Sequence, residues 1–133
     1  MRITIFSATT FEIGPLRDFL TKNWATVEPD FYQKDTVIVH LCTAGIGPVE
    51  TAFFLGKYLT INELDLAINA GIAGSFDKKL PLGSVVQVVS DRFGDIGVEE
   101  ADGRFNDVFE MGFWENDQPP FLAGKLQNPA LSG

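Results

Sequence analysis

Two short glycine turns, each directly after an apolar run, constrain the fold of this chain more than any other feature. The first run, residues 37–43 (VIVHLCT), leads into residues 44–48 (AGIGP), and the second, residues 64–69 (LDLAIN), leads into residues 70–74 (AGIAG). Runs this apolar are typical of strands buried on both faces of a parallel sheet. Open α/β sheets bind ligands at the carboxyl ends of such strands, where glycine allows a close backbone approach. The pattern therefore predicts a small-molecule pocket at one sheet edge.

The size and charge of the chain favour one soluble, cytoplasmic domain. We expect residues 1–133 to form a single domain, because a chain of 133 residues that is 45% hydrophobic can bury a hydrophobic core. A net charge of −8 argues against nucleic acid or an anionic membrane as a partner. No apolar run approaches the roughly 20 residues that span a bilayer. We therefore expect a partner that is a small molecule.

The order of the predicted elements indicates an α/β domain with a mixed sheet. We expect strands over residues 3–6, 26–32, 36–43, 64–69 and 84–90, and helices over residues 11–23 and 48–59. Thr10 is the expected N-cap of the first helix, whose buried face would carry Ile13, Leu16 and Leu20. The buried face of the second helix would carry Phe53, Leu55, Tyr58 and Leu59.

The chain changes character from about residue 95 onward. Aromatic residues gather in a stretch that is otherwise polar and broken by glycine and proline: Phe105, Phe109, Phe113, Trp114 and Phe121. Such a segment packs on a second subunit, on the apolar end of a ligand or on the rest of the chain, and packing within the domain is an equally good interpretation. Residues 127–133 show no pattern of a closing strand or helix, so we expect the fold to be incomplete there.

Several chemical motifs are incomplete. Residues 45–47 match part of a dinucleotide fingerprint, but Glu50 stands where its third glycine belongs. His40 and Cys42 are the only residues of their types, too few for a zinc site or a Ser-His-Asp triad, and we interpret both as structural. We expect neither a metal ion nor another cofactor.

Glu12 is the carboxylate that follows the loop after the first strand. From that position it could hold and deprotonate a water molecule at the ligand-binding edge. The alternative is an acidic residue favoured by the helix dipole in the first turn, and spacing alone favours this alternative.

Taken together, these segments resemble the nucleoside phosphorylase and nucleosidase superfamily. The resemblance is carried by residues 1–8 with Glu12, and by residues 44–49, 69–74 and 80–86. Within the superfamily the chain is most similar to the futalosine hydrolases of menaquinone biosynthesis, through residues 47–48, 70–74, 95–99 and 108–113. The resemblance implies a three-layer α/β/α fold with a mostly parallel sheet, of which residues 1–133 would be the N-terminal part.

This resemblance implies hydrolysis of the N-glycosidic bond of a purine-type nucleoside, most closely futalosine. The family's nucleophilic water is held by a glutamate at the place of Glu12, which reverses the preference drawn from spacing. By the same matching, the ribose side is lined by Ala8, Thr9 and Ile46, and Ala73 and Gly74 lie against the base. Related enzymes also form homodimers, which we expect here.

Water is a better nucleophile for this chain than phosphate. A phosphate site needs converging arginines, but residues 7–10 and 69–74 contain none. We interpret Arg17, which follows Glu12 by one helical turn, as a surface residue. The family's Met-Glu pair and its acidic proton donor have no match after Gly74, since Glu110-Met111 has the reverse order. We therefore expect this chain to be inactive alone. Two alternatives stay open: methylthioadenosine or adenosylhomocysteine as substrate, and a non-catalytic nucleoside-binding module.

Overall fold

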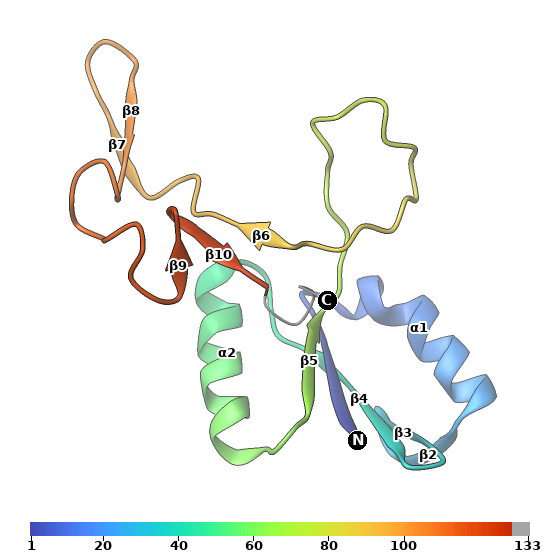
Figure 1. Cartoon of the computed structure of the whole chain (residues 1–133). Coiled ribbons are helices and arrows are strands. Elements are labelled where there is room, and N and C mark those ends of the chain that lie inside the picture. Colours follow the sequence, from blue (N-terminus) through green and yellow to red (C-terminus); the bar gives the residue numbers. More distant parts are fainter. Residues whose placement is uncertain (129–133) are drawn as a thin grey trace. The chain divides into compact units, whose positions relative to one another are not determined.

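The structure, a computed structural model, describes residues 1–128 of the chain. It divides into two compact units, which we call unit 1 (Met1–Phe76) and unit 2 (Asp77–Gly133), and each is described by itself (Figure 1). The single domain over residues 1–133 stays a prediction. Residues 129–133, which belong to the expected unstructured end, lie outside the described residues.

Unit 1 is built on a five-stranded mixed sheet with the order β2-β3-β4-β1-β5. Its central strand β1 (Arg2–Ser7) pairs in parallel with β4 (Val37–Thr43) on one side and β5 (Leu66–Asn69) on the other. The strands β2 (Ala25–Glu28) and β3 (Phe31–Lys34) extend the sheet through antiparallel pairs. The α/β class with a mixed sheet, as predicted from the sequence, is therefore confirmed.

Two helices cover opposite faces of this sheet (Figure 1). The helix α1 (Thr10–Asn23) packs Ile13 and Leu20 on a cluster that contains Val39 and Leu41. The helix α2 (Pro48–Ile61) packs on Phe6 and Cys42 through its residues Phe54, Leu55 and Tyr58. Successive strand residues point to opposite faces, so β4 supplies both clusters. The larger three-layer, nucleoside phosphorylase-like arrangement stays a prediction.

Three local predictions for unit 1 are wrong. Thr9, not Thr10, is the N-cap of α1, because its hydroxyl accepts the N–H of Glu12 while the Glu12 carboxylate accepts the N–H of Thr9. The expected strand over residues 26–32 is two strands, because Pro29 lacks an N–H and Asp30 has a φ of 63°. Strand β5 is exposed rather than buried on both faces, since α2 does not cover its side chains.

The outward face of α2 also differs from the expectation. Phe53 is 76% exposed and Leu59 is 50% exposed, so neither belongs to the buried face. Leu55 and Tyr58 do pack against the sheet, joined by Phe54, whose ring meets Phe6 edge to face. The helical pattern alone could not choose among these residues because α2 is apolar on nearly every side.

Unit 2 has short strands and a compact group of aromatic rings. A three-stranded sheet contains β6 (Ser90–Asp91), β10 (Lys125–Gln127) and β9 (Phe121–Leu122), and a separate pair joins β7 (Gly97–Glu99) to β8 (Phe105–Asp107). The rings of Phe93, Phe109, Trp114 and Phe121 form mutual contacts with centroids 5.1 to 6.4 Å apart. We call these four residues the aromatic cluster. Packing within the unit therefore accounts for three of the five predicted aromatic residues.

The predicted strand over residues 84–90 is wrong except at its end, where Ser90 begins β6. Val85, Val86, Val88 and Val89 are all more than half exposed. A strand needs a neighbouring backbone to pair with. Over residues 84–89 the described hydrogen bonds are those of Ser84 to the nearby carbonyl of Pro81 and those from Asn128 to the carbonyl groups of Val88 and Val89, which do not make a ladder. An apolar β-branched run therefore has strand propensity here without a partner to pair with.

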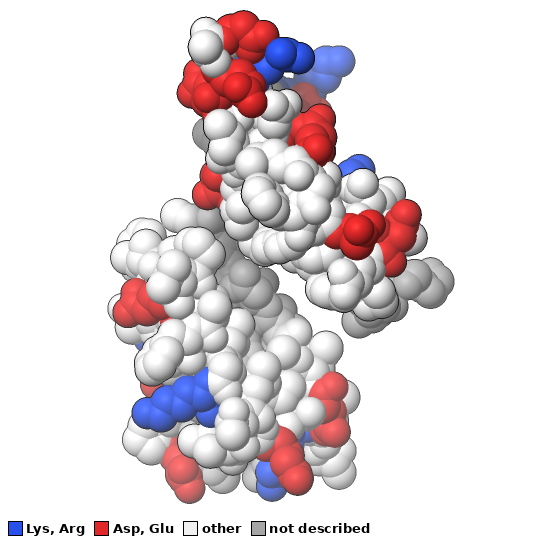
Figure 2. All heavy atoms as spheres, turned by 90° about the vertical axis from the view of Figure 1, so that its left-hand side faces the viewer, with Lys and Arg blue, Asp and Glu red and all other residues white. Residues whose placement is uncertain are grey.

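No helix within residues 1–128 is long and apolar enough to cross a membrane. On the face shown in Figure 2, charged side chains of the described residues form small separate groups, among which acidic ones are prominent. This distribution follows from a chain with 18 acidic and 10 basic residues.

Candidate functional site

The loops that follow β1, β4 and β5 meet at one edge of the unit 1 sheet. The N–H of Ala44 donates to the carbonyl of Ser7 over 2.8 Å, and the N–H of Ala70 donates to the carbonyl of Phe6 over 2.8 Å. Both glycine turns are thereby tied to the end of β1. The three parallel strands place the first-strand loop between the two turns, as the sequence predicts for a ligand-binding edge.

Glu12 connects the first loop to the second glycine turn. Its Oε2 accepts hydrogen bonds from the N–H of Thr9 at 2.8 Å and from the Thr9 hydroxyl at 3.1 Å. Its Oε1 accepts the N–H of Ile72 at 3.2 Å, across 60 positions of the chain. The carboxylate therefore has a defined place at the sheet edge and is more than a favourable charge at a helix end.

These donors also set the charge of Glu12. The hydrogen bond from the N–H of Ile72, followed by that from the N–H of Thr9, lowers the pKa of Glu12 below its ordinary value. The group is thus a carboxylate at neutral pH, suited to orienting water and to stabilising nearby positive charge. Gly71 makes room for it, because a Cβ at that position would lie 2.9 Å from Oε1.

The first glycine turn is held by side chains from the first turns of α2. Gly45 and Gly47 have φ values of 93° and 85°, which residues other than glycine rarely adopt. The N–H of Ile46 donates to Oε2 of Glu50 at 2.9 Å, and the Thr51 hydroxyl donates to the carbonyl of Gly45 at 3.2 Å. Glu50, the residue that breaks the dinucleotide fingerprint, is therefore part of this turn.

The structure brings some of the predicted site residues together. Ala8 and Thr9 lie in the loop beside the Glu12 carboxylate, which accepts the backbone N–H of Thr9. Ala73 and Gly74 are exposed and follow Ile72 directly, whereas Ile46 is 73% exposed on the other turn. The assignment of all six residues to a substrate site, Glu12 included, stays a prediction.

Sequence reasoning missed three groups that shape this edge. They are the backbone N–H of Ile72, the carboxylate of Glu50, and Ser7, whose fully buried hydroxyl donates to the carbonyl of Thr9 at 2.9 Å. The glutamate three residues after Thr9 is a capping-box signal that could have indicated the loop geometry. The Ile72 contact has no local signal, because it depends on the pairing of β1 with β5.

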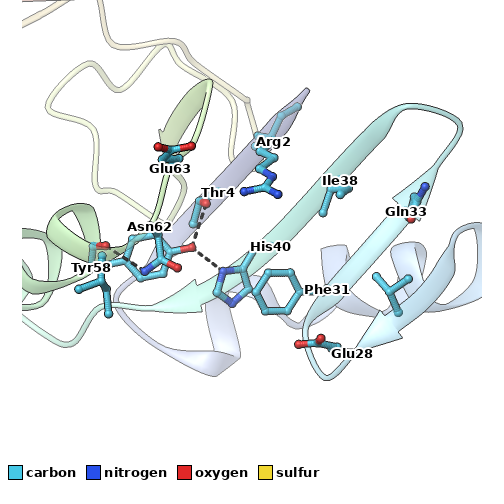
Figure 3. Close-up of a pocket in the computed structure, with 13 residues that line it drawn as sticks. Arg2, Thr4, Glu28, Phe31, Gln33, Ile38, His40, Tyr58, Asn62 and Glu63 are labelled. Atoms are coloured by element: carbon cyan, nitrogen blue, oxygen red, sulfur yellow. Dashed lines mark hydrogen bonds between the residues drawn. The ribbon is translucent and has the colours of Figure 1, made fainter.

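A separate pocket of about 620 Å³ lies on the α2 side of the sheet (Figure 3). On one side of it the His40 ring stacks on Phe31 with centroids 3.7 Å apart, and its Nδ1 is 2.6 Å from the hydroxyl of Tyr58. That hydroxyl also contacts the Thr4 hydroxyl at 3.2 Å. Burial lowers the pKa of His40. These contacts fit the structural role predicted for His40, and none of the predicted substrate residues lines this pocket.

Cys42 lies on the same side of the sheet and is buried, as predicted for a small hydrophobic residue. Burial raises the pKa of its thiol to about 11, so the reactive thiolate is scarce at neutral pH. Across residues 1–128, no three His, Cys, Asp or Glu side chains are grouped as a metal ion would require.

Comparison with known proteins supports a nucleosidase-like relationship over part of the chain. A futalosine hydrolase of Streptomyces coelicolor is 38% identical over 78 residues, which are 55% of this chain and 33% of the relative. The match therefore spans about a third of the relative's length. No family model matches the chain, and no solved structure matches it.

Proposed function

We propose that this chain forms the water-binding side of a nucleosidase that hydrolyses the N-glycosidic bond of a purine-type nucleoside, with futalosine as the favoured substrate. The observation that carries the proposal is the Glu12 carboxylate, fixed at the sheet edge by hydrogen bonds from Thr9 and from Ile72 in the second glycine turn. The partial match to a futalosine hydrolase supports the reaction class and the choice of substrate.

In this reaction a water oxygen bonds to C1′ of the ribose while the C1′–N bond breaks and its electron pair leaves with the base. Positive charge develops on the ribose as that bond stretches. An ionised carboxylate next to the ribose orients the water, accepts its proton and stabilises the charge. The leaving base needs a proton from a second group, which we do not assign.

Water fits this edge better than phosphate does. An inorganic phosphate nucleophile would need cationic side chains near the ribose. The candidate Arg17 is instead bound through its Nε to Oδ1 of Asp30 at 2.8 Å. The Glu12 and Glu50 carboxylates add negative charge to the same edge, which disfavours a second anion.

The test measures release of the base from futalosine by protein expressed from the full reading frame that contains these residues. Glu12→Gln should lower kcat by about 10²- to 10⁴-fold, because the amide keeps the size of the side chain but is no base. Glu28→Gln is the matched control at an exposed carboxylate on β2 and should leave kcat unchanged. Equal rates in the wild type and Glu12→Gln would exclude the proposed role.

The cleavage assay and a thermal shift assay together separate the alternative substrates from a non-catalytic binding module. Faster cleavage of methylthioadenosine or adenosylhomocysteine than of futalosine would change the substrate and keep the reaction. Stabilisation by a nucleoside in a thermal shift assay, without cleavage of any of the three, would show a non-catalytic binding module. A homodimer stays a prediction, which light scattering of the purified protein tests.

A further inference from the structure

Glu50 has a more specific place than an acidic residue at a helix N-terminus requires. It is the third residue of α2, whose N-cap Gly47 has no side chain to accept the exposed N–H groups of the first turn. Its carboxylate reaches back beyond the N-cap to the N–H of Ile46, over 2.9 Å. It thereby closes the glycine turn on itself.

The sequence of the turn is matched to this carboxylate. A Cβ at position 45 would overlap the carboxyl group of Glu50, so glycine at that position provides the space that the side chain occupies. The Thr51 hydroxyl holds the carbonyl of Gly45 from the same helix. Two hydrogen bonds thus join the turn to the start of α2: Ile46 to Glu50, and Thr51 to Gly45.

This arrangement changes what the turn offers to a ligand. Backbone N–H groups in a glycine turn before a helix attract anions such as phosphate. Here the Ile46 N–H already has an anionic partner, and a negative charge stands where an external anion would bind. The Glu50 carboxylate adds hydrogen-bond acceptors to the turn, and these suit the hydroxyl groups of an uncharged sugar.

We propose that Glu50 is a positioning and specificity-determining residue, which holds Ile46 in place at the sugar side of the site and excludes phosphate and phosphorylated sugars from it. The identity of that side as a sugar site rests on the proposed function. The hydrogen bond that closes the turn and the exclusion of phosphate do not depend on the proposed function. Both can therefore be tested without measuring enzymatic turnover.

The experiment records NMR spectra of the backbone amides of residues 45–47 in the wild type, Glu50→Gln and Glu50→Ala. Amide exchange of Ile46 should rise about tenfold or more in Glu50→Ala and stay within about threefold of the wild type in Glu50→Gln, since the amide oxygen of glutamine can still accept this hydrogen bond. Unchanged exchange in Glu50→Ala would overturn the positioning role. Asp18→Asn, at an exposed position on α1, is the control for loss of one negative charge.

The same samples are then titrated with inorganic phosphate. Phosphate should shift the amides of residues 45–47 in Glu50→Ala with an apparent affinity about tenfold higher than in the wild type and in Asp18→Asn. Equal affinities in all three proteins would overturn the exclusion of anions. If these results appear while Glu12→Gln retains full activity, the role of Glu50 stands and the proposed function fails.

Discussion

The two units of the chain reach stable packing by different means. In unit 1 the strands β1 and β4 pair over six positions, and each face of the sheet they form receives a helix. Over residues 77–128, the described part of unit 2, no strand is longer than three residues, and the aromatic cluster and the buried Asp107 organise the chain instead. Backbone pairing therefore determines the first unit, whereas a few side chains determine the second.

Asp107 shows how unit 2 is organised without long strands. Its carboxylate accepts the N–H groups of Phe109 and Glu110, and it pairs with Arg92. The hydrogen bond from Glu110, then that from Phe109, lowers the pKa of Asp107. These hydrogen bonds hold the segment that carries Phe109, whose ring lies in the aromatic cluster. One polar side chain therefore fixes the backbone here, whereas strand pairing fixes it in unit 1.

The largest expected effect tests how far unit 2 depends on its rings. Phe109→Ala should reduce the free energy of unfolding of this unit by about 3–5 kcal/mol, because the 8% exposed ring meets both Trp114 and Phe121. Amide exchange in β8 and β10 measures the loss. Phe113→Ala, at a ring that is 72% exposed, is the control and should change it by less than about 0.5 kcal/mol. Equal losses would refute an organisation around the aromatic cluster.

A second prediction tests how closely α2 seals its side of the unit 1 sheet. Cys42 should react with iodoacetamide at pH 8 about 100-fold more slowly than a free cysteine, because a pKa of about 11 leaves correspondingly less thiolate. The rate should rise with pH until the pH passes about 11. Unfolding in urea should remove the difference, and the native and unfolded rates are compared by mass spectrometry. Rapid native labelling would mean that this face of the sheet is open.

The smallest effect concerns the start of α1 beside the candidate site. Thr9→Ala should lower the free energy of unfolding by about 1 kcal/mol, because it removes the hydroxyl that caps the helix and contacts Glu12. Thr10→Ala is the matched control, since Thr10 is the first helical residue and has no capping role. Urea titrations of both variants measure the difference. A larger loss in Thr10→Ala would place the cap where the sequence first suggested it.

Most of unit 1 could be predicted because its signals are local or periodic. Ile13 and Leu20 follow helical spacing, and the apolar run of β4 is a strand with buried Val39, Leu41 and Cys42. The run over residues 84–89 is just as apolar and β-branched, yet it forms no ladder in the structure. Propensity predicts that a segment can be a strand, and only a neighbouring backbone makes it one.

The candidate site divides in the same way. The residue pattern alone predicts the two glycine turns, the carboxylate after the first strand and the acidic residue that interrupts the dinucleotide pattern. The tertiary structure alone decided that Glu12 meets the N–H of Ile72, since that contact requires β1 and β5 to pair in register. It also decided that Glu50 turns back to Ile46. Composition and spacing describe which groups a chain has, but the distance between groups far apart in sequence depends on how the strands pair and where the helices pack.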